Sequence, residues 1–196
     1  MRIVVGTRGS PLALVQTEQV LSVLRQHKPD IEFTVKQVHS QGDIETEVPL
    51  ADMPRGVFAT ELENALERLE IDMAVHSFKD LPTDLASDFT IAAIGPREDP
   101  RDVLITRSGV CLDDLLSGAR LGTSSPRRLA QLKAHKPDLK VVPIRGNVGT
   151  RIRKVREGVC DGVVLAAAGV RRLGLGDQVT EYLAPDVCLP AAGQGS

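Results

Sequence analysis

The chain of 196 residues is 42% hydrophobic, 26% charged and only 3% aromatic, with a formal net charge of −2. Such a composition is typical of a globular protein of one domain or two small ones, with a core built from aliphatic side chains. It excludes a protein that spans a membrane, because the longest strongly apolar run, residues 162–170, is too short to cross a bilayer.

The N-terminal part alternates strand and helix patterns. A buried strand is expected at residues 3–5, followed by a helix over 11–27 that Ser10 caps and Pro11 begins. Alternating polar and apolar residues predict a second strand over 31–39.

Residues 40–56, which include Arg55, show no clear period and are expected to form a long mobile loop. A helix should begin at Val57, with an apolar stripe that extends to Leu69. Further strands are expected at 72–75 and 89–94.

The charged, proline-bracketed turn at 96–102 is expected to carry the chain from a first lobe, residues 1–98, into a second lobe, residues 99–190. Residues 191–196 would begin a return to the first lobe. The expected elements of the second lobe are a strand at 103–106, a short helix at 112–116, a strand at 161–166 and a helix at 167–173. The pattern of residues 179–188 is ambiguous.

The basic stretch from Arg120 to Arg156 holds eleven Lys or Arg residues and one acid, a formal charge of +10 in a chain of −2. This contrast indicates an anionic partner. Twice in it a strand is followed by a polar turn and a helix, with Ser125 and Asn147 as the expected N-caps. Because helix N-termini attract carboxylates and phosphates, the sequence predicts an anion-binding cleft.

Arginines at these junctions are the candidates for ligand contact: Arg127, Arg128, Arg145 and Arg151. The basic residues elsewhere on the helices are as readily explained as solvated surface. Nucleic acid is the alternative partner, but one Tyr, four Phe and no Trp offer few surfaces for base stacking, and the isoelectric point is only about 6.1. A small polyanion fits better, and we expect no nucleic acid.

The two halves of the chain share an order of signals. Gly6–Ala13 is similar to Gly122–Pro126 with Leu129 and Ala130 one helical step further on, and the tetrapeptide His-Lys-Pro-Asp occurs at 27–30 and again at 135–138. Strands that alternate with helices imply two α/β lobes with largely parallel sheets, which bind ligands at the carboxyl ends of their strands. Arg8 and Ser10 would then face Arg127 and Arg145 across a cleft.

Residues 76–82, His-Ser-Phe-Lys-Asp-Leu-Pro, form the densest group of functional side chains. Asp80 could stabilise a cation or pass a proton, and Lys79 could bind a carboxylate. The alternative is a solvated turn at the end of a strand. Since the chain has no dinucleotide fingerprint, P-loop or nucleophile elbow, the residues alone indicate a two-lobed binder of a small polycarboxylate or phosphate.

The three cysteines are odd in number and widely spaced, which favours neither a disulfide framework nor a metal site. Cys160 and Cys188 are expected in the core. The chain passes from Met1 and Arg2 directly into a strand pattern without the features of a signal peptide, so we expect a cytoplasmic protein without membrane association.

Six stretches resemble the porphobilinogen deaminase (hydroxymethylbilane synthase) family, in the family's order: residues 7–14, 75–82, 97–102, 122–128, 145–151 and 189–195. The resemblance implies two lobes like those of type II periplasmic binding proteins, followed by a third α/β domain. It also implies a transferase of heme biosynthesis that joins four porphobilinogen units with loss of ammonia and uses a dipyrromethane cofactor.

By this resemblance, Asp80 is the catalytic residue that stabilises cationic pyrroles and assists proton transfer. The residues that would bind acidic side chains are Arg8, Lys79, Arg127, Arg128, Arg145, Arg151 and Arg172. The residues that would support cofactor or substrate are Ser10, Thr123, Ser124, Ser125, Asn147 and Gln194. Arg55 stands in the loop where the family more often has Lys.

One departure concerns the cofactor, which the family holds through a thioether to a cysteine of the third domain. The sequence ends before that domain, and the resemblance gives this role to none of Cys111, Cys160 and Cys188. We therefore expect a monomeric deaminase that needs a third domain in cis or in trans. The alternative is a non-catalytic small-polyanion-binding module with the same two-lobe fold.

Overall fold

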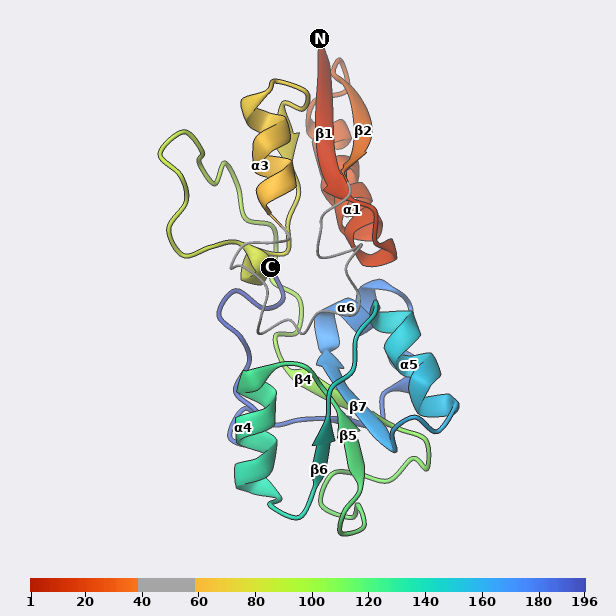
Figure 1. Cartoon of the computed structure of the whole chain (residues 1–196). Coiled ribbons are helices and arrows are strands. Elements are labelled where there is room, and N and C mark those ends of the chain that lie inside the picture. The colour runs from red at the N-terminus through yellow and green to blue at the C-terminus, as the bar shows by residue number, and fades with distance from the viewer. Residues whose placement is uncertain (39–58) are drawn as a thin grey trace. The chain divides into compact units, whose positions relative to one another are not determined.

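The computed structural model describes residues 1–38 and 59–196, which form two compact units (Figure 1). Unit 1 comprises Met1–Pro96 with Ser196, and unit 2 comprises Arg97–Gly195. The sequence predicts the boundary between the lobes at 98/99, two residues further along the chain than the boundary between the units. The expected loop over 40–56, its Arg55 and the expected start of a helix at Val57 lie outside the described residues.

Unit 1 contains a three-stranded parallel sheet in the order β2-β1-β3. Its strands are β1 (Arg2–Arg8), β2 (Glu32–Val38) and β3 (Met73–Ala74). The strands predicted at 3–5, 31–39 and 72–75 are confirmed, although β3 is short. Because all three strands run in one direction, the residues that follow β1 and β3 lie at the same edge of the sheet.

Helix α1 (Pro11–His27) begins as predicted, because the Ser10 hydroxyl accepts a hydrogen bond from the backbone N–H of Ala13 at 3.2 Å. Helix α4 (Pro126–His135) of unit 2 ends in the same way as α1. Both helices stop at the first residue of the His-Lys-Pro-Asp tetrapeptide, and the following lysine has φ −137° after α1 and −134° after α4. The repeat therefore encodes one helix end twice, since proline disfavours helical backbone at the residue before it.

Helix α3 (Thr60–Glu67) buries Leu62 and Ala65 in a small core with Ile71. Gly6 of β1 lies so close to this core that a Cβ atom there would meet Ile71 Cδ1 at 2.3 Å. The prediction that Leu69 continues the apolar stripe is wrong. The helix ends at Glu67, and Leu69 is 88% exposed with a φ of 56°.

The predicted strand over 89–94 is also wrong. The segment has no regular secondary structure, and Ile91 and Ile94 are 42% and 56% exposed. In the described part of unit 1, β1 is already flanked by β2 and β3, and no strand pairs with this segment. Without a partner for its backbone groups, an alternating pattern does not form a strand.

Unit 2 contains a five-stranded mixed sheet in the order β6-β5-β7-β4-β8. Its strands are β4 (Asp102–Thr106), β5 (Arg120–Gly122), β6 (Lys140–Val142), β7 (Gly162–Ala166) and β8 (Glu181–Tyr182). β5 is parallel to β6 and β7, whereas β4 is antiparallel to β7 and β8. The predicted strands at 103–106 and 161–166 are confirmed.

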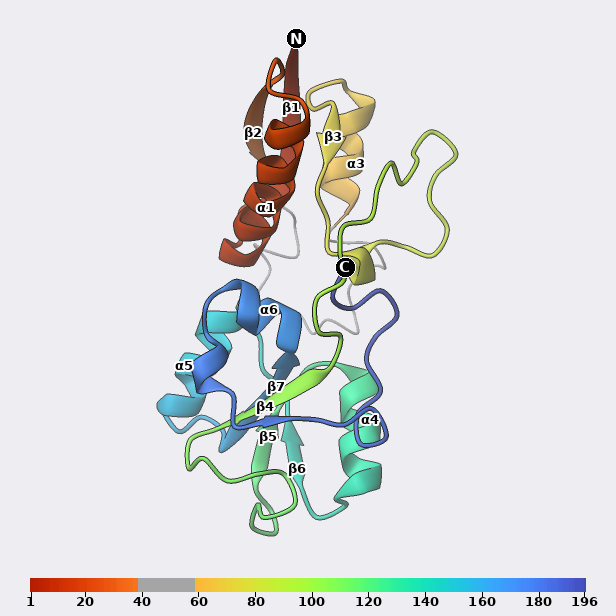
Figure 2. The ribbon, with the colours of Figure 1, turned by 180° about the vertical axis from the view of Figure 1, so that it is seen from behind.

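Helices cover both faces of this sheet, with α4 on one side and α5 (Val148–Arg156) and α6 (Ala167–Arg172) on the other (Figures 1 and 2). Successive residues of β4 alternate between the two cores: Val103 and Ile105 join the core beneath α5 and α6, and Leu104 joins the core beneath α4. This alternation is the period-2 pattern of a strand buried on both faces.

The short helix predicted at 112–116 is wrong. The segment forms turns in which Leu112 and Leu115 are buried, and Leu116 is exposed. The helix predicted at 167–173 is confirmed by α6, and a short 3-10 turn, η3 (Gly176–Gln178), lies between α6 and β8.

The reversed direction of β4 has a consequence for the charged residues. Asp102, the first residue of β4, pairs with Ala166, the last residue of β7. Although Asp102 begins its own strand, it lies at the carboxyl edge of β5 and β7. This is the edge at which open α/β sheets bind ligands.

None of the helices in the described ranges is long and apolar enough to cross a membrane. Cys160 and Cys188 are buried, as predicted, whereas Cys111 is exposed, and all three are free thiols. Within residues 1–38 and 59–196, no group of His, Cys, Asp and Glu side chains could hold a metal ion.

Candidate active site

The carboxyl edge of the sheet in unit 1 brings together Arg8, the last residue of β1, and the segment that follows β3. That segment includes the 3-10 turn η2 (Phe78–Asp80), on which Lys79 is exposed. A hollow lies between them. Its lining consists of Arg8, Ser10, Leu12, Ala13, Gln16, Val75, His76, Ser77 and Asp80.

Arg8 and Asp80 form the charged pair of this hollow. Arg8 Nη1 lies 3.9 Å from Asp80 Oδ2, and the two side chains are 19% and 33% exposed. The pair is loose enough for each group to contact a ligand as well: the guanidinium can bind a carboxylate, and the carboxylate can balance a cation or accept a proton. The structure thus brings together Arg8, Ser10 and Asp80, three of the residues predicted from the sequence.

His76 lies in the same hollow. Burial lowers the pKa of His76, Asp80 acts to raise it, Arg8 acts to lower it, and the net direction is down. The imidazole is therefore neutral near pH 7, where it can donate or accept a hydrogen bond without adding charge. Beside it, the Ser77 hydroxyl donates to Gln16 Oε1 at 2.9 Å, which fixes the turn against α1.

In unit 2, α4 and α5 begin at the carboxyl ends of β5 and β6, and their predicted caps are confirmed. The Ser125 hydroxyl accepts from the N–H of Arg128 at 3.4 Å, and Asn147 Oδ1 accepts from the N–H of Thr150 at 2.9 Å. Both helix N-termini therefore point their partial positive charge toward the same edge of the sheet.

Three arginines at this edge are near enough to influence one another. Burial first, and then the like charges of Arg128 and Arg145, lower the pKa of Arg151 to about 10. Arg151 donates through Nε to the carbonyl of Gly146 at 2.7 Å, and in the part of the chain that the structure describes the buried Nε atom of Arg128 has no hydrogen-bond partner. Cations held together in this way favour an anion with several acceptor atoms.

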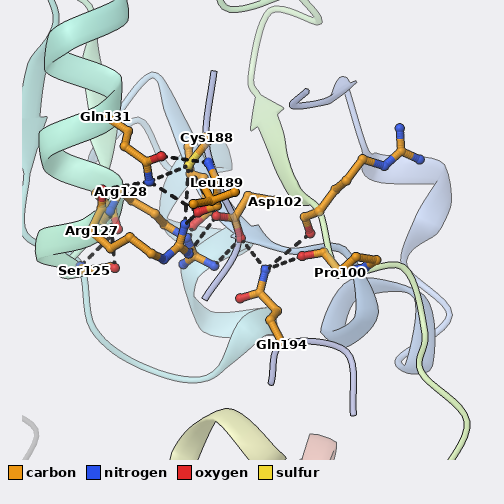
Figure 3. Close-up of polar contacts among 12 residues, drawn as sticks. Pro100, Asp102, Ser125, Arg127, Arg128, Gln131, Cys188, Leu189 and Gln194 are labelled. Atoms are coloured by element: carbon orange, nitrogen blue, oxygen red, sulfur yellow. Dashed lines mark hydrogen bonds and ion pairs between the residues drawn. The ribbon is translucent and has the colours of Figure 1, made fainter. Parts of the chain in front are cut away.

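Asp102 is the centre of a hydrogen-bond network beside these arginines (Figure 3). Its side chain is fully buried and accepts hydrogen bonds from Arg127 Nη2 at 2.8 Å and from Arg128 Nη2 at 2.7 Å. Gln194 Nε2 donates to it at 2.8 Å, and the Cys188 thiol lies 3.4 Å away. Burial acts to raise the pKa of Asp102, but Arg128, Arg127 and Gln194 outweigh it and lower the pKa to about 2. Asp102 is therefore ionised.

The network also holds the segment that follows β8. Arg127 Nη1 donates to the carbonyl of Leu189, and Gln131 exchanges two hydrogen bonds with the backbone of the same residue, at 2.7 Å and 3.3 Å (Figure 3). The Arg127 side chain is 26% exposed, so part of it faces solvent in addition to these internal bonds.

The remaining predicted residues have internal roles in the structure. Ser124 exchanges hydrogen bonds with the backbone of Ile144, and Thr123 accepts from the N–H of Ser125. Gln194 is buried and also donates to the carbonyl of Pro100 at 2.7 Å. Arg172 donates to the carbonyl of Gly195 at 2.8 Å, and burial lowers its pKa, with Glu98 acting in the opposite direction.

Sequence reasoning did not single out Asp102 or Gln131. A hint was present for Asp102, because the three residues after it, Val103, Leu104 and Ile105, are all apolar and predict a buried strand. The arginines that it pairs with are 25 and 26 positions away, and only the antiparallel placement of β4 brings them together. The expectation that Arg8 and Ser10 face Arg127 and Arg145 stays a prediction.

The fold and the charged groups define a class of protein: two α/β units of the type II periplasmic-binding-protein kind, with cationic groups at the carboxyl edges of their sheets. The probable amino-acid ABC transporter extracellular-binding protein ytmK of Bacillus subtilis shares this fold with a TM-score of 0.53 at 12% identity. The match covers 94% of this chain and 78% of that protein.

The chain belongs to the porphobilinogen deaminase family. Residues 3–196 match the family model described as "Porphobilinogen deaminase, dipyromethane cofactor binding domain". The chain is 53% identical to porphobilinogen deaminase of Desulforudis audaxviator (strain MP104C) over 99% of its own length, and 52% identical to that of Shouchella clausii (strain KSM-K16) over 100%. In both comparisons it spans 63% of the length of the relative.

Proposed function

We propose that this chain provides the catalytic carboxylate and the anion-binding residues of a hydroxymethylbilane synthase, a transferase of heme biosynthesis. The reaction joins four porphobilinogen units stepwise and releases ammonia at each step. The observation that carries the proposal is the hollow of unit 1, where the Asp80 carboxylate lies 3.9 Å from the Arg8 guanidinium beside a neutral His76. Membership of the family supports it independently.

Asp80 suits the two demands of this reaction. Loss of ammonia from the aminomethyl group leaves positive charge on the pyrrole, and joining the next pyrrole releases a proton. A carboxylate within contact distance can balance the charge and accept the proton. Since Asp80 is partly shielded but not enclosed, it can contact a bound pyrrole directly.

The arginines suit the side chains of the substrate. Porphobilinogen carries an acetate and a propionate, so a growing chain presents several carboxylates. Arg8 in unit 1 and Arg128, Arg145 and Arg151 in unit 2 would bind them through charge-assisted hydrogen bonds. Lys79, Arg127 and Arg172 are further candidates. For Arg127 and Arg172 a ligand would compete with the backbone carbonyls that they bond in the structure.

The dipyrromethane cofactor fits the same residues, because it carries the same acidic side chains and offers pyrrole N–H donors to a carboxylate. The buried Nε of Arg128, which has no hydrogen-bond partner within residues 1–38 and 59–196, supports a role in binding such an acceptor. When bound, the cofactor supplies the pyrrole to which the first substrate unit is joined. Arg128, Arg145 and Arg151 would hold its carboxylates.

A non-catalytic module that binds small polyanions with the same fold is the second candidate. Such a module needs the arginines but not a carboxylate in the hollow, where Asp80 would repel an anionic ligand. The retention of Asp80 beside Arg8 therefore favours the enzyme. We expect it to act as a monomer in the cytoplasm, with the third domain that the family resemblance implies supplied in cis or in trans.

Bilane formation from porphobilinogen tests the proposal, measured on this chain together with the C-terminal region of a relative. Asp80→Asn should lower kcat by about 100-fold or more, because the amide can neither balance the charge nor accept the proton. Asp84→Asn, an exposed position four residues further on, is the matched control and should retain full activity. Normal turnover by Asp80→Asn would reject the catalytic role, and turnover by no form of the chain would favour the binding module.

A further inference from the structure

We propose that Asp102 is the positioning residue of the anion site in unit 2: its carboxylate holds Arg127 and Arg128 so that the Nε of Arg128 remains available to a carboxylate ligand. The identity of that ligand rests on the proposed function. The positioning role of Asp102 rests on the hydrogen bonds within unit 2.

The two oxygens of Asp102 are shared among four donors (Figure 3). Oδ1 accepts from Arg128 Nη2 at 2.7 Å and from Gln194 Nε2 at 2.8 Å. Oδ2 accepts from Arg127 Nη2 at 2.8 Å and from the Cys188 thiol at 3.4 Å. Each guanidinium therefore has its own oxygen, and the carboxylate cannot turn without breaking bonds to both.

Two of the three guanidinium nitrogens of Arg128 are held by hydrogen bonds. Nη1 donates to the carbonyl of Val164 at 3.1 Å and Nη2 donates to Asp102, whereas the buried Nε has no hydrogen-bond partner among the described residues. The whole side chain is only 8% exposed. A buried N–H group without an acceptor costs free energy, so an anion that accepts from this nitrogen removes that cost. Because Arg128 is already held by its other hydrogen bonds, binding costs little further side-chain entropy.

Only a carboxylate can perform this task at position 102. An asparagine has the same size, but its amide presents one acceptor and one donor group where the structure requires four accepted bonds. At least one of Arg127, Arg128 and Gln194 would then face an N–H group and turn away. Asp102→Asn thus removes the orientation of the arginines while it leaves their number and their charge unchanged.

Asp161→Asn provides a matched control in the same unit. Asp161 also pairs with an arginine, Arg120 Nη2, at 3.1 Å, and it also accepts from a backbone N–H, that of Arg120, at 2.8 Å. However, it directly precedes β7, whereas Asp102 pairs with the last residue of β7. The two carboxylates therefore lie at opposite edges of the sheet, and only Asp102 is near the arginines that bind the ligand.

Binding is measured by calorimetry with porphobilinogen and, separately, with inorganic phosphate, on the wild-type chain and on both variants. The Nε–H resonance of Arg128, assigned through its loss in Arg128→Lys, is followed during each titration. In Asp102→Asn we expect the Kd for both probes to rise by about tenfold and the ligand-induced shift of the Arg128 resonance to disappear. Asp161→Asn should bind as the wild type does.

A purely structural role for Asp102 would lower the melting temperature but leave the Kd and the Arg128 resonance of the folded fraction unchanged, and this result would overturn the inference. If the wild type binds phosphate but not porphobilinogen, the proposed function fails, while the phosphate titrations still decide the role of Asp102. Binding of neither probe would overturn both.

Gln194→Met keeps the inference testable if Asp102→Asn does not fold. This variant removes one donor from Asp102 Oδ1 but leaves the carboxylate and both arginines in place. We expect a Kd about fivefold higher for both probes and a reduced shift of the Arg128 resonance. An unchanged Kd with an unchanged resonance would contradict a positioning role.

Discussion

Asp102 shows how a buried charge is maintained in unit 2. Removal of a carboxylate from water costs several kcal/mol unless its partners restore what hydration provided. Two guanidinium groups and an amide do so here, and the pKa of about 2 shows that they more than offset burial. In turn, Asp102 balances part of the positive charge that Arg128 shares with Arg145 and Arg151.

The ionised Asp102 should make stability depend on pH in acid. Its pKa falls from an ordinary value of 3.8 to about 2 on folding, so its contribution is complete above about pH 4 and is lost as the pH falls toward 2. The size of this contribution is about 2 kcal/mol. Urea unfolding at pH 6 and pH 2 should show that the wild type loses about 2 kcal/mol more than Asp102→Asn over this interval. Equal losses in the two proteins would show that Asp102 is not paired as the structure has it.

At the scale of the secondary-structure elements, three helices end in the same way. After α3, α5 and α6, one residue takes left-handed backbone while two backbone N–H groups bond back to the last turn: Leu69, Gly158 and Gly174, with φ of 56°, 79° and 68°. This is the Schellman motif, in which glycine is the usual residue. Leu69 is the exception, with a strained backbone and an exposed side chain.

Leu69→Gly should therefore stabilise the chain by about 1 kcal/mol, because it relieves the left-handed strain and removes no buried contact. Gly174→Ala is the matched control in the opposite direction. A Cβ atom there would meet nothing within 4 Å, so only the backbone strain should act, and a loss of about 1 kcal/mol is expected. Chemical unfolding of the two variants measures both effects. A destabilised Leu69→Gly would show that the leucine side chain makes a contact that the exposed fraction conceals.

The sequence predicts these elements well where the signals are local. Ser10, Ser125 and Asn147 cap helices as expected, because capping depends only on the next three residues. The strand predicted at 89–94 failed because apolar spacing alone does not show whether a strand has a partner to pair with. The helix predicted at 112–116 failed because leucines in a turn can be buried as well as leucines in a helix. Leu112 and Leu115 reach the core without a helix.

At the scale of the whole molecule, the two α/β units and their cationic edges could be predicted, because strand and helix signals alternate and the charge is concentrated in one stretch. The antiparallel direction of β4 could not. It places Asp102 at the carboxyl edge, opposite Ala166, and joins it to arginines distant in sequence. The candidate site therefore follows partly from motifs and partly from a sheet topology that no local pattern encodes.

We propose that arginines at these edges recognise the carboxylates of a small pyrrole substrate. The most direct test compares, by calorimetry, the binding of porphobilinogen with that of its dimethyl ester, which keeps the ring and the aminomethyl group but has no carboxylate charge. If the arginines carry recognition, the ester should bind about 100-fold more weakly, since at least two charge-assisted hydrogen bonds are lost. Equal affinity of acid and ester would show that the arginines do not recognise the carboxylates.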